Sequence, residues 1–149
     1  MGELGELGCS ELAVRLRLRI TAGSKTIECV ALLNSGYEAP SPQLLIPADL
    51  ARDLGFWPPV DAYEVELETA GGVLRAWLYP RACRVKVVAP DVESREVEAD
   101  IVVAPIASEP LISDALAEEL EIAVESFGRG LWRFRWEPKE KARPSGKRK

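Results

Sequence analysis

Residues 12–20 alternate between apolar and polar side chains. Arginines occupy positions 15, 17 and 19, and the alternate positions hold Leu12, Val14, Leu16, Leu18 and Ile20. Because successive side chains of a strand point to opposite faces, this pattern predicts a half-buried β-strand. A second strand follows Gly23 and becomes wholly apolar at residues 30–33, as expected for a strand that enters the core.

The rest of the pattern predicts further strands and two short helices. A short strand at 44–46 leads into a helix that Pro47 begins and Gly55 ends. Strands at 65–68 and 73–79 flank Thr69-Ala70-Gly71-Gly72, which predicts a β-hairpin with a glycine-rich tip. Further predicted elements are strands at 83–88 and 101–104, a helix at 114–120, a hairpin across 128–130, and a strand at 131–136.

One segment of this pattern occurs twice. The spacing of Leu, Ile and Ala in residues 45–56 recurs in residues 111–122, displaced by 66 positions. Each copy predicts a short strand followed by a helix. The repeat therefore indicates a mostly β domain whose two halves are related by an internal pseudo-twofold axis.

Length and charge suggest one folded domain with two distinct ends. A chain of 149 residues can bury a core without disulfide or metal staples, and we assign residues 1–11 to an N-terminal extension and 12–136 to the domain. The net charge is −5, yet residues 137–149 hold six basic side chains and two acidic ones among prolines and a glycine. This composition predicts a disordered, solvated basic tail. It lacks interleaved aromatic residues, so nucleic acid is not an expected partner.

Composition also excludes several kinds of chemistry. The chain has no histidine and three cysteines without CxxC spacing, so we expect no metal site, no cofactor, and no Ser-His or Cys-His catalysis. No apolar run is long enough to span a bilayer, and residues 1–7 lack the features of a secretory signal, so we expect a cytoplasmic protein. Asparagine and glutamine occur once each among many ionic residues, which hints at a thermophile.

The single asparagine, Asn34, stands at the most informative position. An apolar strand delivers the string Leu32-Leu33-Asn34-Ser35-Gly36 into a predicted tight turn. This string resembles the Asp-Thr/Ser-Gly signature of retropepsin-like aspartic proteases. Glu109-Pro110-Leu111-Ile112-Ser113-Asp114-Ala115-Leu116 similarly resembles the Leu-Ile-Gly-x-x-Leu element of that family.

The resemblance covers roughly residues 12–136 and implies a fold and a site. The implied fold is a closed-barrel-like acid protease domain with two short helices and a β-hairpin flap, and the implied assembly is a homodimer around an extended peptide. The catalytic positions would be Asn34, Ser35 and Gly36, and substrate would contact Tyr37 and the flap residues Ala70, Gly71 and Gly72. The C-terminal strand at 131–136, with Trp132, Phe134 and Trp136 on one face, would join the dimer sheet or form the floor of the core.

Three departures from the family pattern change what is expected. Ser113 replaces a glycine, although a serine can cap the following helix. Tyr37 and Glu38 replace a small residue and would alter or partly fill the cleft. Asn34 replaces the catalytic aspartate, and an amide cannot take a proton from water as a carboxylate does. Asp100, which lies 66 residues after Asn34, does not substitute for it, because it is expected to begin a strand rather than to end one.

Two interpretations of the asparagine stay open. In the first, the protein is a natural retropepsin-like homologue that no longer cleaves but still binds an extended peptide. In the second, it is a genuine aspartic endopeptidase inactivated by an engineered Asp→Asn substitution at position 34. A third interpretation, a β-rich module that reaches nucleic acid through its basic tail, ranks below both.

Overall fold

The computed structural model describes residues 13–34, 36–69 and 72–147, and this part of the chain is mostly β with two short α-helices. The first half contains β1 (Arg15–Ala22), β2 (Lys25–Leu33), β3 (Gln43–Ile46), α2 (Ala48–Leu54), β4 (Tyr63–Thr69) and β5 (Gly72–Val87). The second half contains β6 (Val97–Val103), β7 (Leu111–Ile112), α3 (Asp114–Glu119), β8 (Ile122–Ser126), β9 (Leu131–Phe134), a 3₁₀ turn (Lys139–Lys141) and β10 (Arg143–Pro144). No described helix is long and apolar enough to cross a membrane.

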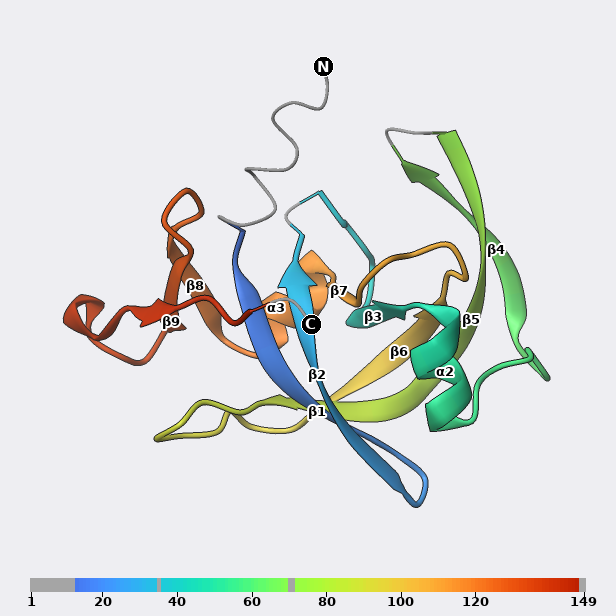
Figure 1. Ribbon diagram of the computed structural model, residues 1–149, viewed down its shortest axis with the longest axis horizontal. Coiled ribbons are helices and arrows are strands. Elements are labelled where there is room, and N and C mark those ends of the chain that lie inside the picture. The colour runs from blue at the N-terminus through green and yellow to red at the C-terminus, as the bar shows by residue number, and fades with distance from the viewer. Residues whose placement is uncertain (1–12, 35, 70–71, 148–149) are drawn as a thin grey trace.

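Six strands form a closed barrel. They are hydrogen-bonded in the order β1-β2-β7-β3-β6-β5, and an additional antiparallel pairing between β1 and β5 closes the ring. Figure 1 shows β5 curving from an upright hairpin with β4 into its pairing with β1. Because β4 pairs with β5 outside the ring, it is the edge strand of this sheet.

The alternating pattern at the start of the chain behaves as predicted. In β1 and just before it, the inward residues Val14, Leu16, Leu18 and Ile20 are buried. Leu12 lies outside the described residues. Arg15 is on the opposite face, yet it is also buried, because its guanidinium forms a bidentate ion pair with Glu109 at 2.9 and 3.0 Å. A loop from the other half of the domain thus covers part of the polar face of this strand.

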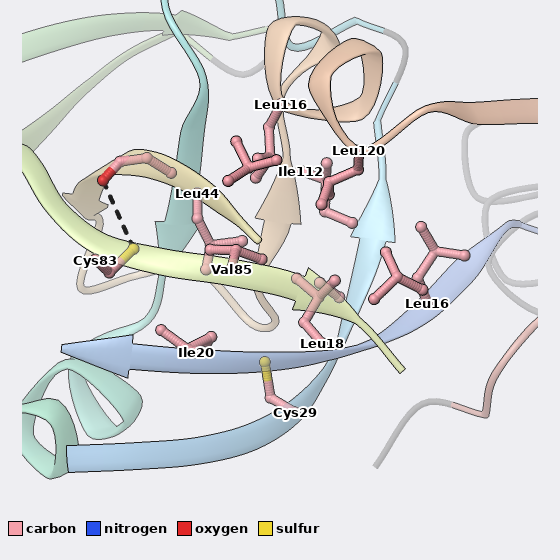
Figure 2. Close-up of a cluster of buried hydrophobic side chains, with 14 of the residues drawn as sticks. Leu16, Leu18, Ile20, Cys29, Leu44, Cys83, Val85, Ile112, Leu116 and Leu120 are labelled. Carbon is pink, nitrogen blue, oxygen red and sulfur yellow. Dashed lines mark hydrogen bonds between the residues drawn. The ribbon is translucent and has the colours of Figure 1, made fainter. Parts of the chain in front are cut away.

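The barrel interior is a single apolar cluster. Figure 2 shows that leucine and isoleucine side chains of β1 gather with Leu44 of β3, Val85 of β5, Ile112 of β7 and Leu116 of α3. Cys83 lies at the side of this cluster, where its thiol contacts the carbonyl oxygen of Ala99 at 3.6 Å. The buried alternate positions of six strands therefore supply most of the stabilisation of the fold.

The sequence repeat corresponds to a structural repeat. In each half a short strand leads directly into a helix, β3 into α2 and β7 into α3. The two strands pair antiparallel with Leu45 opposite Leu111, which are equivalent residues of the repeat. Such a pairing places a pseudo-twofold axis between these two residues. Gly55 ends α2 in the left-handed conformation (φ 94°), as its position after the helix predicted.

Two strand boundaries differ from the prediction. Strand β5 is one continuous strand of 16 residues, whereas the sequence suggested two strands at 73–79 and 83–88. The interruption is a β-bulge between Tyr79 and Cys83, within which Arg81 has a positive φ of 47°. Strand β6 begins at Val97 rather than at Ile101, so that Asp100 lies within the strand.

The C-terminal strand belongs to the core of its own chain. β9 is the central strand of a small sheet in the order β10-β9-β8, so both of its edges are occupied within the chain. Trp132 and Phe134 are buried, as expected for the floor of the core, whereas Trp136 lies beyond the strand and is 54% exposed. The alternative, that this strand joins a dimer sheet, is therefore wrong for β9.

Residues 137–147, which composition assigns to a disordered basic tail, make specific contacts with the domain. Arg143 and Glu137 are buried, and the Arg143 guanidinium donates hydrogen bonds to the carboxylates of Glu137 and Asp91. Beyond them, the Gly146 N–H donates to the Arg15 carbonyl at 2.7 Å. The charges of Lys141 and Arg143 are thus neutralised by Asp91 and Glu137, which leaves these two residues less available to nucleic acid.

Candidate functional site

Asn34 follows directly on the last residue of β2 and is half-buried. Its backbone N–H donates to the carbonyl of Ile112 at 3.4 Å, and its own carbonyl accepts from the Tyr37 N–H at 3.0 Å. The side-chain Oδ1 accepts from the Gly36 N–H at 3.0 Å, which forms a tight Asx-type turn. The loop therefore fixes the orientation of the amide before any ligand arrives.

The second half of the domain repeats this arrangement with a different residue. Strand β2 runs parallel to β7, and β6 runs parallel to β3, at equivalent positions about the pseudo-twofold axis. The hydrogen bond from Asn34 N to Ile112 O therefore matches the one from Ala104 N to Ile46 O. The structural counterpart of Asn34 is Ala104, a fully buried apolar residue.

Asp100 is not the counterpart of Asn34, although the 66-residue offset suggests it. Sequence analysis excluded it because it would begin a strand, but it lies inside β6 and its carboxylate is buried. That carboxylate accepts hydrogen bonds from the Ser41 hydroxyl at 2.7 Å and from the Arg81 N–H at 2.8 Å. The offset fails here because the connection before β7 (residues 104–110) is shorter than the one before β3 (residues 34–42). Asp100 holds the bulge and the loop together and lies outside the groove described below.

The loop after Asn34 is anchored by hydrogen bonds at several points. The Tyr37 hydroxyl donates to Gln43 Oε1 at 2.8 Å, and the Tyr37 carbonyl accepts from the Asp114 N–H at 2.8 Å. The Asp114 carboxylate in turn accepts from the Ala39 N–H at 2.9 Å. Burial, with the charge of Asp100 as a smaller cause, raises the pKa of Tyr37, so its hydroxyl stays protonated and keeps donating.

Ser113 connects this loop to helix α3. Its fully buried hydroxyl oxygen accepts from the Gln43 N–H at 3.0 Å and from the Leu116 N–H at 3.1 Å. The second bond is the predicted helix cap. The replacement of glycine by serine thus leaves the packing of strand, loop and helix intact.

A groove of about 800 Å³ lies between the Asn34 loop and strand β4. It is open to solvent on one side and is lined by Asn34, Gly36, Tyr37, Glu38, Leu45, Glu66, Leu67, Glu68 and Leu111. The groove brings together the ends of β2 and β7 with the hairpin, three parts of the chain that are far apart in the sequence. Its volume falls within the range of ligand-binding clefts, about 300–1,000 Å³.

The lining divides into an apolar floor and an acidic rim. Leu45 is buried and Leu67 and Leu111 are half-buried, whereas Glu38, Glu66 and Glu68 are exposed. The described lining residues include no basic side chain. Asn34 contributes a neutral amide that can donate and accept hydrogen bonds but cannot exchange a proton with water near neutral pH. Asn34 therefore offers the groove hydrogen bonds but no group that can activate water.

The predicted site residues are only partly brought together. Asn34, Gly36 and Tyr37 line the groove, while Gly72 begins β5 with a positive φ of 117° and does not line it. Ser35, Ala70 and Gly71 lie outside the described residues, so the predicted hairpin tip is not tested.

Apart from Glu38, which was expected to alter the cleft, five lining residues were not singled out as site residues from the sequence: Leu45, Glu66, Leu67, Glu68 and Leu111. The acidic pair had a visible signal, because Glu64-Val65-Glu66-Leu67-Glu68 alternates strictly. The alternation predicts a strand with one acidic face, but it does not say what that face meets.

No cluster of three His, Cys, Asp or Glu side chains that would hold a metal ion occurs in the described ranges. Comparison with known proteins gives no match, neither to a model of a protein family nor to a curated protein. The resemblance to retropepsin-like proteases therefore rests on the motifs of the chain.

Proposed function

We propose that this protein is a retropepsin-like homologue that binds an extended peptide as a homodimer and does not cleave it. The observation that carries the proposal is the placement of Asn34. The residue ends a core strand, is oriented by a tight turn, and opens onto a groove of about 800 Å³ beside a β-hairpin.

The dimer follows from the internal symmetry. Aspartic proteases need two carboxylates that share one proton, so that one acts as base toward water and the other as acid toward the scissile carbonyl. In this chain the counterpart of Asn34 is the buried Ala104, so the second polar group must come from another copy. Two Asn34 amides across a twofold axis would hydrogen-bond to a peptide without exchanging protons with water.

The alternative is an active aspartic endopeptidase whose natural residue at position 34 is aspartate. The geometry around Asn34 is compatible with it, because a carboxylate oxygen could accept the same hydrogen bond from the Gly36 N–H. Codon 34 of the natural gene distinguishes the two directly. An aspartate codon would favour the endopeptidase, and an asparagine codon would favour the non-cleaving homologue.

The decisive experiment compares the protein with its Asn34→Asp variant on unfolded protein substrates, with products identified by mass spectrometry. We expect no cleavage by the Asn34 protein between about pH 3 and 7, and an acid-optimum, pepstatin-sensitive activity in the variant. The gain should exceed the ~10²–10⁴-fold that general base catalysis alone supplies, because acid and base appear together. Asn34→Ala is the matched control and should stay silent.

Three outcomes would contradict parts of this proposal. Cleavage by the Asn34 protein that survives repurification would exclude a non-cleaving homologue. An inactive Asn34→Asp variant that still dimerises would exclude a cleft that is intact apart from the amide. A strict monomer in light scattering at micromolar concentration would exclude the shared site itself.

A further inference from the structure

The rim of the groove carries acidic side chains that form no ion pair within the part of the chain that the structure describes. Glu38, Glu66 and Glu68 take part in no ion pair with other described residues. Glu64, two positions earlier on the same strand, does pair with Arg75 at 2.7 Å. Three carboxylates without an ion pair among the described residues thus line one groove, where they create a negative potential that a ligand can neutralise.

The spacing of these carboxylates matches the repeat of an extended chain. Glu66 and Glu68 are alternate residues of β4, so their side chains leave the same face of the strand about 7 Å apart. Leu67 points to the opposite face, where it packs with the apolar floor. A ligand strand with charged residues at every second position presents its own side chains with the same period and with the same separation of faces.

The strand itself offers a backbone partner. β4 is the edge of its sheet, so the N–H and C=O groups on its outer side have no strand partner among the described elements. An extended segment can add to such an edge through backbone hydrogen bonds, while its alternate side chains reach pockets on either side.

We infer that the groove selects extended peptide segments in which basic side chains alternate with apolar ones. The inference rests on the proposed function and adds the class of ligand. Lysine or arginine side chains would face the carboxylates of the rim, and the intervening apolar side chains would cover the floor formed by Leu45, Leu67 and Leu111. Because the carboxylates are exposed, each ion pair should contribute only about two- to fivefold in affinity, and salt should weaken it.

The test measures binding of fluorescent peptides to the full-length protein by anisotropy. The reference peptide is Lys-Leu-Lys-Val-Lys-Leu, and matched peptides carry Gln or Glu in place of every Lys. We expect the Lys peptide to bind roughly tenfold more tightly than the Gln peptide, with the Glu peptide weakest. Raising the salt from about 50 to about 500 mM should remove most of the difference between the Lys and Gln peptides.

Protein variants locate the effect on the groove. Glu66→Gln/Glu68→Gln should lower affinity for the Lys peptide by roughly tenfold and leave that for the Gln peptide unchanged. The matched control is Glu96→Gln/Glu98→Gln, which alters two exposed carboxylates with the same spacing and the same change in net charge, away from the groove. Equal weakening by both double variants would mean that net charge alone attracts the peptide, and would overturn the inference.

The results with the different peptides also distinguish a failure of this inference from a failure of the proposed function. Equal binding of the Lys, Gln and Glu peptides would leave a peptide-binding groove in place and overturn only its preference for basic residues. Failure of every peptide to bind would contradict the proposed function itself. A peptide with the sequence of residues 143–149 is basic but lacks apolar side chains, and equally tight binding of it would identify the tail of a second copy as the occupant instead.

Discussion

Replacement of Arg143 by methionine tests whether the C-terminal segment is part of the folded domain. Arg143 is 8% exposed, and its guanidinium donates to the carboxylates of Glu137 and Asp91. It also lies over the rings of Trp132 and Phe134, 5.8 and 5.6 Å from their centres. Methionine keeps much of the apolar contact with these rings and removes the charge and every donor.

The size of the effect follows from what the substitution leaves behind. Glu137 is 6% exposed and would remain buried with only Lys141, whose Nζ lies 3.9 Å from its carboxylate, as a nearby cation. Removal of one partner of a buried ion pair typically costs about 3–5 kcal/mol. The Glu137 carboxylate keeps a hydrogen bond from the Phe134 N–H at 3.0 Å and can take up a proton, so the lower end of that range applies. Loss of the contact with Asp91 adds little, because that carboxylate is exposed and screened.

We therefore expect Arg143→Met to lower the free energy of unfolding by about 3 kcal/mol, equivalent to a fall in Tm of about 6–12 °C for a domain of this size. Urea unfolding followed by tryptophan fluorescence measures it, since Trp132 lies beside the substitution. Lys139→Met, at an exposed position of the same segment, should change stability by less than about 0.5 kcal/mol.

A double variant provides the second control. Glu137→Leu/Arg143→Met removes the buried charge together with its partner and should recover much of the lost stability. If Arg143→Met unfolds within about 0.5 kcal/mol of the unmodified protein, residues 137–147 contribute nothing to the fold, and the disordered tail expected from composition is correct after all.

Three further predictions concern titration and capping. The hydrogen bonds from Arg143 hold the pKa of Glu137 below its usual value of 4.5, so the free energy of unfolding should be full above that pH and fall as the pH drops below it. Glu137→Gln should flatten this dependence of stability on pH, measured by urea unfolding. An unchanged dependence would contradict the role given to Glu137. Burial raises the pKa of Cys83 to about 12, so iodoacetamide should alkylate this thiol far more slowly in the native protein at pH 8 than in urea. Mass spectrometry measures the two rates, and equal rates would exclude a buried thiol. Ser113→Ala deprives the Gln43 N–H of its acceptor and α3 of its cap, so unfolding should require about 2 kcal/mol less, and a loss below about 0.5 kcal/mol would show that water replaces the hydroxyl.

The elements whose signals are local were predictable. Alternation at 12–20 predicted β1 and its buried face, and Pro47 and Gly55 correctly marked the ends of α2. The hairpin that joins β4 to β5 and the repeated strand-helix unit were visible for the same reason. In each case neighbouring residues determine the outcome, because side-chain period and backbone conformation depend on the next few positions.

What only the tertiary structure decided depends on partners far apart in the chain. Composition favours disorder after residue 137, but Asp91 and the arginine at 143 lie 52 positions apart and meet only in the folded state. The offset of the repeat suggested Asp100 as the counterpart of Asn34, whereas strand register assigns that position to Ala104.

For the candidate site, too, some features could be read from the sequence and others depended on the tertiary structure. The sequence by itself placed Asn34 at the end of a buried strand. The acidic alternation of residues 64–68 was also visible in it, because both are properties of short segments, although its role was not predicted. That the two lie on one groove was decided by barrel closure, which carries β4 over the end of β2. Such proximity depends on which strands pair and in which register, and the free energy that selects the register comes from burial of the whole core rather than from any one segment.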